Sequence, residues 1–274
     1  MKIFSLVTIL AGFWISSFGQ ALNETVQISD DLYYSEIMDS TYVIEHHFPS
    51  RCNSMFVLVG DNKGVLIDTP DETTGTKSLI EWIESKFGNI ELVAINTGFH
   101  YDNLGGNEFL HSQGITIYGA GLTARLVEEN ALKSKEIVLE YTNKLEDKKY
   151  FKAFSNLNFF PPTDTFEIND GLNLTINDEI FEVYFPGESH TIDNMVVYIK
   201  NKNVLFGGCM VLSLNHRRPG YIADANMIDW PKSVENLREK YKNAKIVIPG
   251  HGDWGNIDLL TYTIEILNNW NINH

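Results

Sequence analysis

The stretch NTGFHYDNLGGN, residues 96–107, follows the apolar run IELVAI at 90–95. The run is typical of a buried β-strand, and the Gly-Gly pair indicates a turn into a helix. His100 and Asp102 are metal-ligand types, whereas Gly98 has no side chain with which to bind a metal. The stretch is therefore a metal-binding turn, a metal-binding turn that lacks one ligand, or an ordinary strand-to-helix connection.

Outward from this stretch, the chain reads as strands followed by a helix, twice over. This order predicts an α/β protein of the αβ/βα four-layer sandwich type, in which two β-rich halves pack face to face with helices outside. No G-x-G-x-x-G follows a first strand, so dinucleotide binding has no support. The predicted strands are 42–48, 54–60, 63–70, 90–98 and 116–120 in the first half, and 164–168, 172–176, 179–187, 194–200, 202–208 and 244–252 in the second. The predicted helices are 73–87, 123–149, 230–241 and a closing helix from 257.

The N-terminus has the pattern of a secretory signal peptide. Lys2 precedes a short apolar segment, and small or polar residues follow near 19–21. The segment is short for a membrane span, although an uncleaved anchor is the alternative. We therefore expect a signal peptide at 1–20, one domain at 21–274, and a periplasmic protein without membrane attachment after cleavage.

The charge balance excludes several classes of partner. The chain has 21 basic and 36 acidic residues, giving a net charge of −15, and removal of Lys2 makes it −16. Such a surface repels nucleic acid and anionic lipid. Arg217 and Arg218 form the only basic pair near a candidate site.

Five ligand-type residues follow apolar strands. His100 and Asp102 follow the predicted strand at 90–98, and three others follow further apolar runs: His190, Cys209 and His251. Each lies at a predicted C-terminal strand end beside a glycine-containing turn. If the strands lie side by side, these ends converge on one edge. Imidazole, thiolate and carboxylate together favour zinc over calcium or magnesium.

The order and spacing of five motifs resemble those of the metallo-β-lactamase family, in the subclasses that use a cysteine ligand. The motifs are TGFHYDNLGGN, PGESHTIDNMVVY, LFGGCMVLSL, IADANMIDWPKSVENL and IPGHGDWG. The resemblance extends over nearly the whole mature chain. It implies a monomeric, zinc-dependent hydrolase that opens the cyclic amide of β-lactam antibiotics and so confers antibiotic resistance.

The resemblance also implies two zinc positions of unequal quality. The family's three-histidine position is reduced here to His100 and His190, because Gly98 stands where the first histidine belongs. A related subclass has Asn at that place and works with a single zinc. We expect one tight zinc and a weak second one. The tight position takes the residues that match the other ligand set: Asp102, Cys209 and His251.

The implied catalytic residues are Asp102, His190 and His100, which would orient and deprotonate the attacking water. Two departures affect substrate binding. The family's lysine three residues beyond the cysteine is Leu212, and the asparagine of its Gly-Asn pair is Tyr221. We therefore expect substrate contacts from Tyr221 and from the residues of the basic pair: Arg217 and Arg218.

Other interpretations remain open. His46 and His47 are expected in a mobile loop over the site, where they would contact substrate. Cys52 and Cys209 are the only two cysteines, and in an exported protein they could form a disulfide, which would destroy the Asp-Cys-His position. A related hydrolase of esters, thioesters or lactones, and a zinc-binding protein with lost catalysis, are the functional alternatives.

Overall fold

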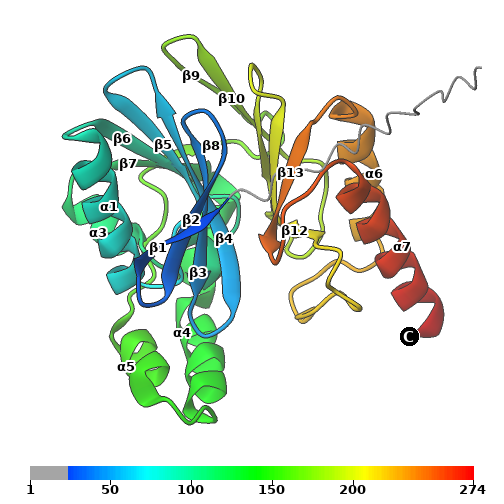
Figure 1. Ribbon diagram of the computed structural model, residues 1–274. Coiled ribbons are helices and arrows are strands. Elements are labelled where there is room, and N and C mark those ends of the chain that lie inside the picture. The colour runs from blue at the N-terminus through cyan, green and yellow to red at the C-terminus, as the bar shows by residue number, and fades with distance from the viewer. Residues whose placement is uncertain (1–23) are drawn as a thin grey trace, which may run out of the picture.

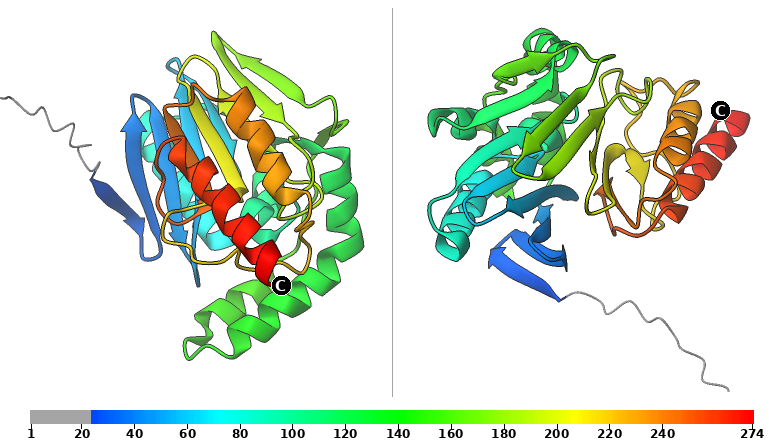
Figure 2. Two further views of the ribbon diagram at one scale, coloured as in Figure 1. Left: turned by 90° about the vertical axis from the view of Figure 1, so that its right-hand side faces the viewer. Right: turned by 90° about the horizontal axis from the view of Figure 1, so that it is seen from above.

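The computed structural model describes residues 24–274, so the predicted signal peptide lies outside the described residues. Two sheets face each other, and helices cover their outer faces (Figures 1 and 2). Helices α1 (Thr73–Phe87) and α3 (Asn107–Ser112) lie outside the first sheet. Helices α6 (Trp230–Lys240) and α7 (Asp258–Asn273) lie outside the second. The predicted αβ/βα four-layer sandwich is thus confirmed.

The first sheet has eight strands in sequence order. Strands β1 to β5 each pair antiparallel with the next. From β5 to β8, each strand pairs parallel with the next. The strands are β1 (Thr25–Ser29), β2 (Leu32–Met38), β3 (Thr41–His47), β4 (Arg51–Val59), β5 (Lys63–Ile67), β6 (Glu91–Ile95), β7 (Thr116–Ala120) and β8 (Asp164–Phe166).

Strand β8 corrects one sequence-based expectation. Residues 164–168 were expected to open the second half, but β8 pairs parallel with β7 at the edge of the first sheet. The connection between the two strands holds α4 (Gly121–Asn143) and α5 (Lys148–Asn156). Parallel neighbours need such a crossover, and this one returns the chain to the sheet it left. The single helical region predicted at 123–149 is accordingly two helices.

The second sheet has five strands in the order β13-β12-β11-β10-β9. Only β12 and β13 pair parallel, and their register shifts on either side of Gly208. The strands are β9 (Leu172–Ile176), β10 (Glu179–Tyr184), β11 (Val196–Ile199), β12 (Val204–Leu212) and β13 (Ile246–His251).

The main core lies between the two sheets. It joins buried side chains of the first sheet, such as Met55 and Ile67, to buried side chains of the second, such as Phe181 and Phe206. Separate apolar clusters hold the outer helices against each sheet. Burial of each large apolar side chain is worth about 1.5–3 kcal/mol, so the layers are fixed chiefly by this packing.

Helix α1 shows how local sequence sets an element that borders the site. Glu72 caps its N-terminus by accepting from the backbone N–H of Thr74 at 2.7 Å, and Gly88 ends it with a φ of 78°. Leu79 and Ile83 are one turn apart and both face the first sheet's core. The loop just before the cap is therefore held firmly.

Helices α4 and α5 form a hairpin that projects past the edge of the sheets (Figure 1). Val138 of α4 and Phe154 of α5 are buried together with Phe48, which follows β3. This packing places one face of α4 beside the sheet edge that carries the site. Within residues 24–274, no helix combines the length and apolarity needed to cross a membrane.

Candidate metal centre

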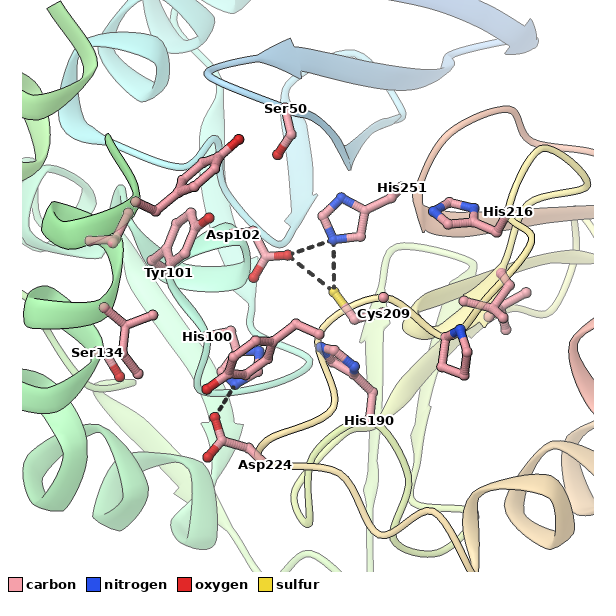
Figure 3. Close-up of a pocket in the computed structure, with 18 residues that line it drawn as sticks. Ser50, His100, Tyr101, Asp102, Ser134, His190, Cys209, His216, Asp224 and His251 are labelled. Carbon is pink, nitrogen blue, oxygen red and sulfur yellow. Dashed lines mark hydrogen bonds and ion pairs between the residues drawn. The ribbon is translucent and has the colours of Figure 1, made fainter. Parts of the chain in front are cut away.

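Three of the predicted ligands meet at one edge of the two sheets (Figure 3). Asp102 lies in α2 (Tyr101–Leu104), Cys209 in β12, and His251 is the last residue of β13. His251 Nε2 is 2.9 Å from Asp102 Oδ2 and 3.8 Å from Cys209 Sγ, and Cys209 Sγ is 3.3 Å from Asp102 Oδ2. One ligand atom from each lies within 4.8 Å of the others. Nitrogen, sulfur and oxygen donors at this spacing fit a zinc ion.

Cys209 owes its position to an irregularity in β12. The strand was expected to end before Cys209, but it continues to Leu212. Gly208, with a φ of 54°, pairs with Pro249 of β13, but the register shifts on both sides of it, and the next pair is Leu212 opposite His251. The bulge turns the Cys209 side chain toward His251 and Asp102.

His251 is oriented by a backbone group on another strand. Its Nδ1 lies 2.9 Å from the carbonyl oxygen of Arg51, so Nδ1 carries the proton and donates. Nε2 is then the ring atom that faces Asp102 and Cys209. Arg51 is itself held by Glu45 at 2.9 Å and Asp253 at 2.6 Å. Such outer contacts fix the tautomer of a metal-binding histidine.

The charges in this cluster are arranged for a cation. Burial raises the pKa of Asp102, but its hydrogen bond to His251 and the charges of the surrounding histidines outweigh this and hold the pKa well below its usual value. Burial lowers the pKa of His251, but the hydrogen bond and charge of Asp102 raise it to about 9. Burial and the Asp102 charge raise the pKa of the Cys209 thiol. A bound cation would take over the role of the His251 proton and release the thiol proton.

His100 and His190 form a second group beside the first. Their ring centroids are 5.1 Å apart, with the rings nearly perpendicular. His100 Nε2 contacts Asp224 Oδ2 at 3.2 Å, and Asp224 also contacts Lys133 Nζ at 3.3 Å. Because Nε2 is engaged, Nδ1 is the nitrogen of His100 left for a metal or a water molecule.

His190 is buried and neutral. Burial and the neighbouring His100 charge lower its pKa to about 3. Its Nδ1 is one of the few buried side-chain polar atoms in the described part of the chain without a hydrogen-bond partner. An unprotonated imidazole of this kind can accept a proton or bind a metal.

Gly98 has no side chain with which to complete a three-histidine set. The packing around it leaves little room for one. Its φ lies outside the left-handed region, so the turn does not require glycine for its backbone. A Cβ at this position would lie 2.4 Å from Nδ2 of Asn194 and 3.1 Å from Oδ1 of Asn103. The Oδ1 of Asn194 accepts from the backbone N–H of Thr191 at 3.0 Å, which holds the amide in place. The amide of Asn194 therefore occupies the direction in which a third ligand would project.

The turn that carries His100 and Asp102 rests on a buried carboxylate. Asp68 accepts from Thr97 N at 2.7 Å, Thr97 Oγ1 at 2.6 Å and Asn103 Nδ2 at 2.8 Å. Burial raises the pKa of Asp68 to about 7 despite these bonds. Gly105 is required close by, because a Cβ there would lie 2.0 Å from the carbonyl oxygen of Asp71. The motif glycines thus let α2 approach the loop before α1.

A cavity of about 450 Å³ opens over both groups. One wall is the face of α4 that carries Ile137 and Tyr141, and the other comes from β12 and the loop after it. Tyr221 and His216 both line the cavity, and the contact of Tyr221 with substrate stays a prediction. Arg217 and Arg218 are exposed and lie outside the lining residues, so their contact with substrate stays a prediction.

Two expectations about other residues are wrong. His46 and His47 do not lie in a loop over the site, because β3 extends to His47 and only three residues connect it to β4. His46 is buried, whereas His47 is exposed. Cys52 and Cys209 are both free thiols, so the disulfide alternative is also wrong.

Asp224 is the functional contact that sequence reasoning missed. It lies in IADANMIDWPKSVENL, a motif quoted for the resemblance, but nothing in its spacing links it to a histidine 124 residues earlier. The hydrogen bond from His100 lowers the pKa of Asp224, and Lys133 adds to this effect. Its side chain is therefore an anion that can hold the His100 ring in one orientation.

Comparison with known proteins agrees with the fold. The sequence pattern of the Metallo-beta-lactamase superfamily matches residues 47–251. The chain is 27% identical over 253 residues to the metallo-beta-lactamase type 2 of Bacteroides fragilis, covering 90% of each chain. It is 32% identical over 212 residues to the metallo-beta-lactamase type 2 of Bacillus cereus, covering 77% of this chain and 72% of the relative.

Solved structures agree with these matches. The chain is similar to a crystal structure of VMB-1, with a TM-score of 0.73 and 30% identity over 89% of this chain and 99% of the other. It is also similar to a metallo-beta-lactamase from Pontibacter korlensis, with a TM-score of 0.68 and 30% identity over 90% and 99%. Fold and site define a metal-binding protein of the αβ/βα sandwich class. The chain belongs to the metallo-β-lactamase superfamily.

Proposed function

We propose that this protein is a zinc-dependent β-lactamase that hydrolyses the cyclic amide of β-lactam antibiotics. The observation that carries the proposal is the convergence of Asp102, Cys209 and His251 at the floor of a substrate-sized cavity. The relatives named as metallo-beta-lactamases, which match over most of the chain, support the same activity.

Zinc held by these three side chains would supply a Lewis acid that stabilises the negative charge developing on the lactam during ring opening. His190, neutral and buried, can accept the proton of the attacking water, and His100 can orient that water while Asp224 holds its ring. The Asp102 carboxylate can accept a second hydrogen bond from the water. These roles make His190, His100 and Asp102 the proposed catalytic residues.

Substrate placement would rest mainly on apolar contact. The cavity is bounded by Ile137 and Tyr141 of α4 and by Leu212, which stands where the family has a cationic lysine. His216 and Tyr221 are the polar side chains on the opposite wall that could contact the substrate carboxylate. Arg217 and Arg218 are proposed as longer-range contacts, since flexible cationic side chains on the same loop can reach toward an anion.

We infer that His100 and His190 bind a second zinc only weakly. Two imidazoles without a third ligand give an incomplete site, because zinc in proteins has at least three protein ligands as a rule. We also propose that residues 1–20 direct export, so that the mature protein acts as a periplasmic monomer and confers antibiotic resistance. The leader-like sequence before the folded domain supports that part of the proposal.

One observation favours a different substrate within the same superfamily. The replacement of a cationic anchor by Leu212 would suit an ester, thioester or lactone that lacks a carboxylate. A zinc-binding protein with lost catalysis would share the same metal cluster. Only measurements of substrate turnover distinguish these alternatives from a lactamase.

The test measures zinc content and hydrolysis of a penicillin, a cephalosporin, a carbapenem and a thioester by the same preparation. We expect lactam hydrolysis to disappear after chelation and to return with added zinc. Undiminished lactam hydrolysis by exhaustively chelated protein would contradict the proposal. Faster thioester than lactam turnover would favour the second substrate class, and zinc binding without any turnover would indicate lost catalysis.

A further inference from the structure

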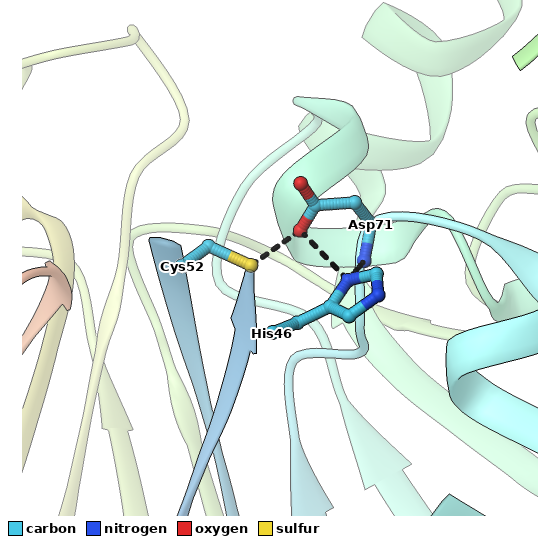
Figure 4. A group of neighbouring side chains, drawn as sticks. All are labelled: His46, Cys52 and Asp71. Atoms are coloured by element: carbon cyan, nitrogen blue, oxygen red, sulfur yellow. Dashed lines mark hydrogen bonds and ion pairs between the residues drawn. The ribbon is translucent and has the colours of Figure 1, made fainter. Parts of the chain in front are cut away.

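A second group of metal-ligand side chains lies apart from the five residues described above (Figure 4). His46 in β3 and Cys52 in β4 are directly opposite each other across the strand pair, so their side chains share one face of the sheet. Asp71 comes from the loop that the Glu72 cap fixes before α1. Their exposed fractions are 2%, 1% and 1%.

The Asp71 carboxylate in this group is poorly compensated. Its Oδ1 contacts the Cys52 thiol, which is a weak donor. His46 Nδ1 lies 3.6 Å from the same oxygen and accepts from the backbone N–H of Asp71 at 3.1 Å, so it cannot donate to the carboxylate. Within residues 24–274, no lysine or arginine forms an ion pair with Asp71. A buried carboxylate with so little compensation favours a nearby cation.

We propose that His46, Cys52 and Asp71 form a second transition-metal site of the zinc class. Ligand atoms of the three residues all lie within 4.8 Å of one another, the same spacing criterion that the Asp102 cluster meets. Nδ1 of His46 is unprotonated, because it accepts a hydrogen bond, and can therefore bind a metal if it gives up the Asp71 amide. Binding would displace the thiol proton of Cys52 to solvent, leaving nitrogen, thiolate sulfur and carboxylate oxygen as donors.

A neighbouring cavity and a glycine leave space beside His46. His46 lines a second cavity of about 450 Å³, together with three acidic residues, Asp30, Asp31 and Glu72, and one basic residue, Lys149, which is paired with Asp31. Acidic groups attract a cation to this opening. Gly75 makes room for the ring, because a Cβ there would lie 2.8 Å from Nε2 of His46. The proposal does not depend on lactam hydrolysis.

The experiment replaces zinc by cobalt in the full folded protein and measures two quantities, cobalt per chain and thiolate-to-cobalt charge-transfer absorption. The variants are Cys209→Ser, Cys52→Ser and the double substitution. We expect each single variant to lose one cobalt and about half of the absorption, and the double variant to lose nearly all of it. Cys52→Ser should retain its hydrolytic activity, whereas Cys209→Ser should not.

Asp71→Asn provides a second, nearly isosteric test in case Cys52→Ser fails to fold, because an amide is a much poorer zinc ligand than a carboxylate. Circular dichroism and thermal melting establish that each variant is folded. Loss of all thiolate-to-cobalt absorption in Cys209→Ser, or unchanged cobalt content in both folded Cys52→Ser and Asp71→Asn, would overturn the second site. Absent lactam turnover with both cobalt signals intact would count only against the proposed function.

Discussion

The Asp102-Cys209-His251 cluster and the His100/His190 pair lie side by side, yet only the first is built to hold a cation by itself. In the first, a carboxylate, a thiol and an imidazole come from α2, a bulged β12 and the end of β13, and their ligand atoms already converge. In the second, two rings meet nearly at right angles and Asn194 fills the direction of a third. The two groups therefore differ in the number of metal-ligand atoms that converge and in whether any of those ligands is an anion.

In the proposed mechanism, the two groups also have different tasks. A bound metal is retained where anionic ligands compensate its charge, so the Asp102 cluster would bind it. His190 has a pKa of about 3, and His100 is fixed by Asp224, so this pair is arranged to handle a water molecule and its proton. With Gly98 in place of a histidine, the proposed role of this pair is to orient a water molecule and accept its proton.

The largest expected effect comes from alanine substitution on the two sides of this comparison. His251→Ala removes a ligand of the intact cluster. Loss of a residue that only contacts a metal ligand lowers metal affinity by about 10–100-fold. Loss of the ligand itself should lower zinc affinity by more than this, and lactam hydrolysis should fall to background. His100→Ala should keep its tight zinc and lower kcat by about 100-fold, because the attacking water loses the side chain that orients it toward the general base, His190.

Zinc content by elemental analysis and steady-state kinetics of the two variants decide between the assignments. Equal loss of zinc from His251→Ala and His100→Ala would mean that both groups hold one shared metal. In that case the division of tasks described above is wrong.

Much of this arrangement could be predicted from the sequence, because periodicity and motif order are local features. The helix predicted at 73–87 is α1 itself. Of the five predicted ligand-type residues, those at 102, 209 and 251 form one cluster, and those at 100 and 190 line the same cavity. The error at β8 arose because local sequence does not show which sheet a strand joins. Only the length of the crossover through α4 and α5 could have indicated that return.

The rest of the site depends on contacts between distant residues. Asn194 opposite Gly98, the Arg51 carbonyl on His251 and Asp224 on His100 join positions 96 to 200 residues apart. No spacing rule predicts such contacts. His46 lies in a strand because the connection between β3 and β4 is short. The sequence EHHFP does not show how short that connection is.

A smaller effect is expected when the missing histidine is restored. Gly98→His alone should be destabilised by about 1–3 kcal/mol through overpacking against Asn194, and should bind a second zinc no better than wild type. Gly98→His combined with Asn194→Ala should relieve the contact and let three imidazoles converge. Zinc titration by calorimetry should then show a second tight ion in the double variant only.

The matched control is Gly98→Phe with Asn194→Ala, which fills the same space with a ring that cannot bind zinc. A second tight zinc in this control, or in wild type, would show that the histidine at position 98 is not what completes the site. A tight second zinc in Gly98→His alone would show that Asn194 yields easily.

The smallest effect concerns the pH dependence of the metal-free protein. Because Asp102 raises the pKa of His251 from 6.5 to about 9, the folded state binds that proton more tightly than the unfolded chain. This contribution to stability is complete below pH 6.5 and is lost as the pH rises to about 9. Of the other shifted groups, His190 titrates mainly below about pH 7, whereas Asp68, with a pKa of about 7, and the thiols of Cys52 and Cys209, whose pKa values burial raises, also bind their protons more tightly in the folded state. The free energy of unfolding of chelated wild type should therefore fall between pH 7 and 9, and the fall should be smaller in His251→Gln, which lacks only the His251 contribution. Zinc competes with the same proton, so zinc affinity should rise over the same range.

Denaturant titrations at several pH values, with and without zinc, measure how the free energy of unfolding and the zinc affinity change with pH. Parallel slopes for wild type and His251→Gln would show that His251 does not hold the extra proton.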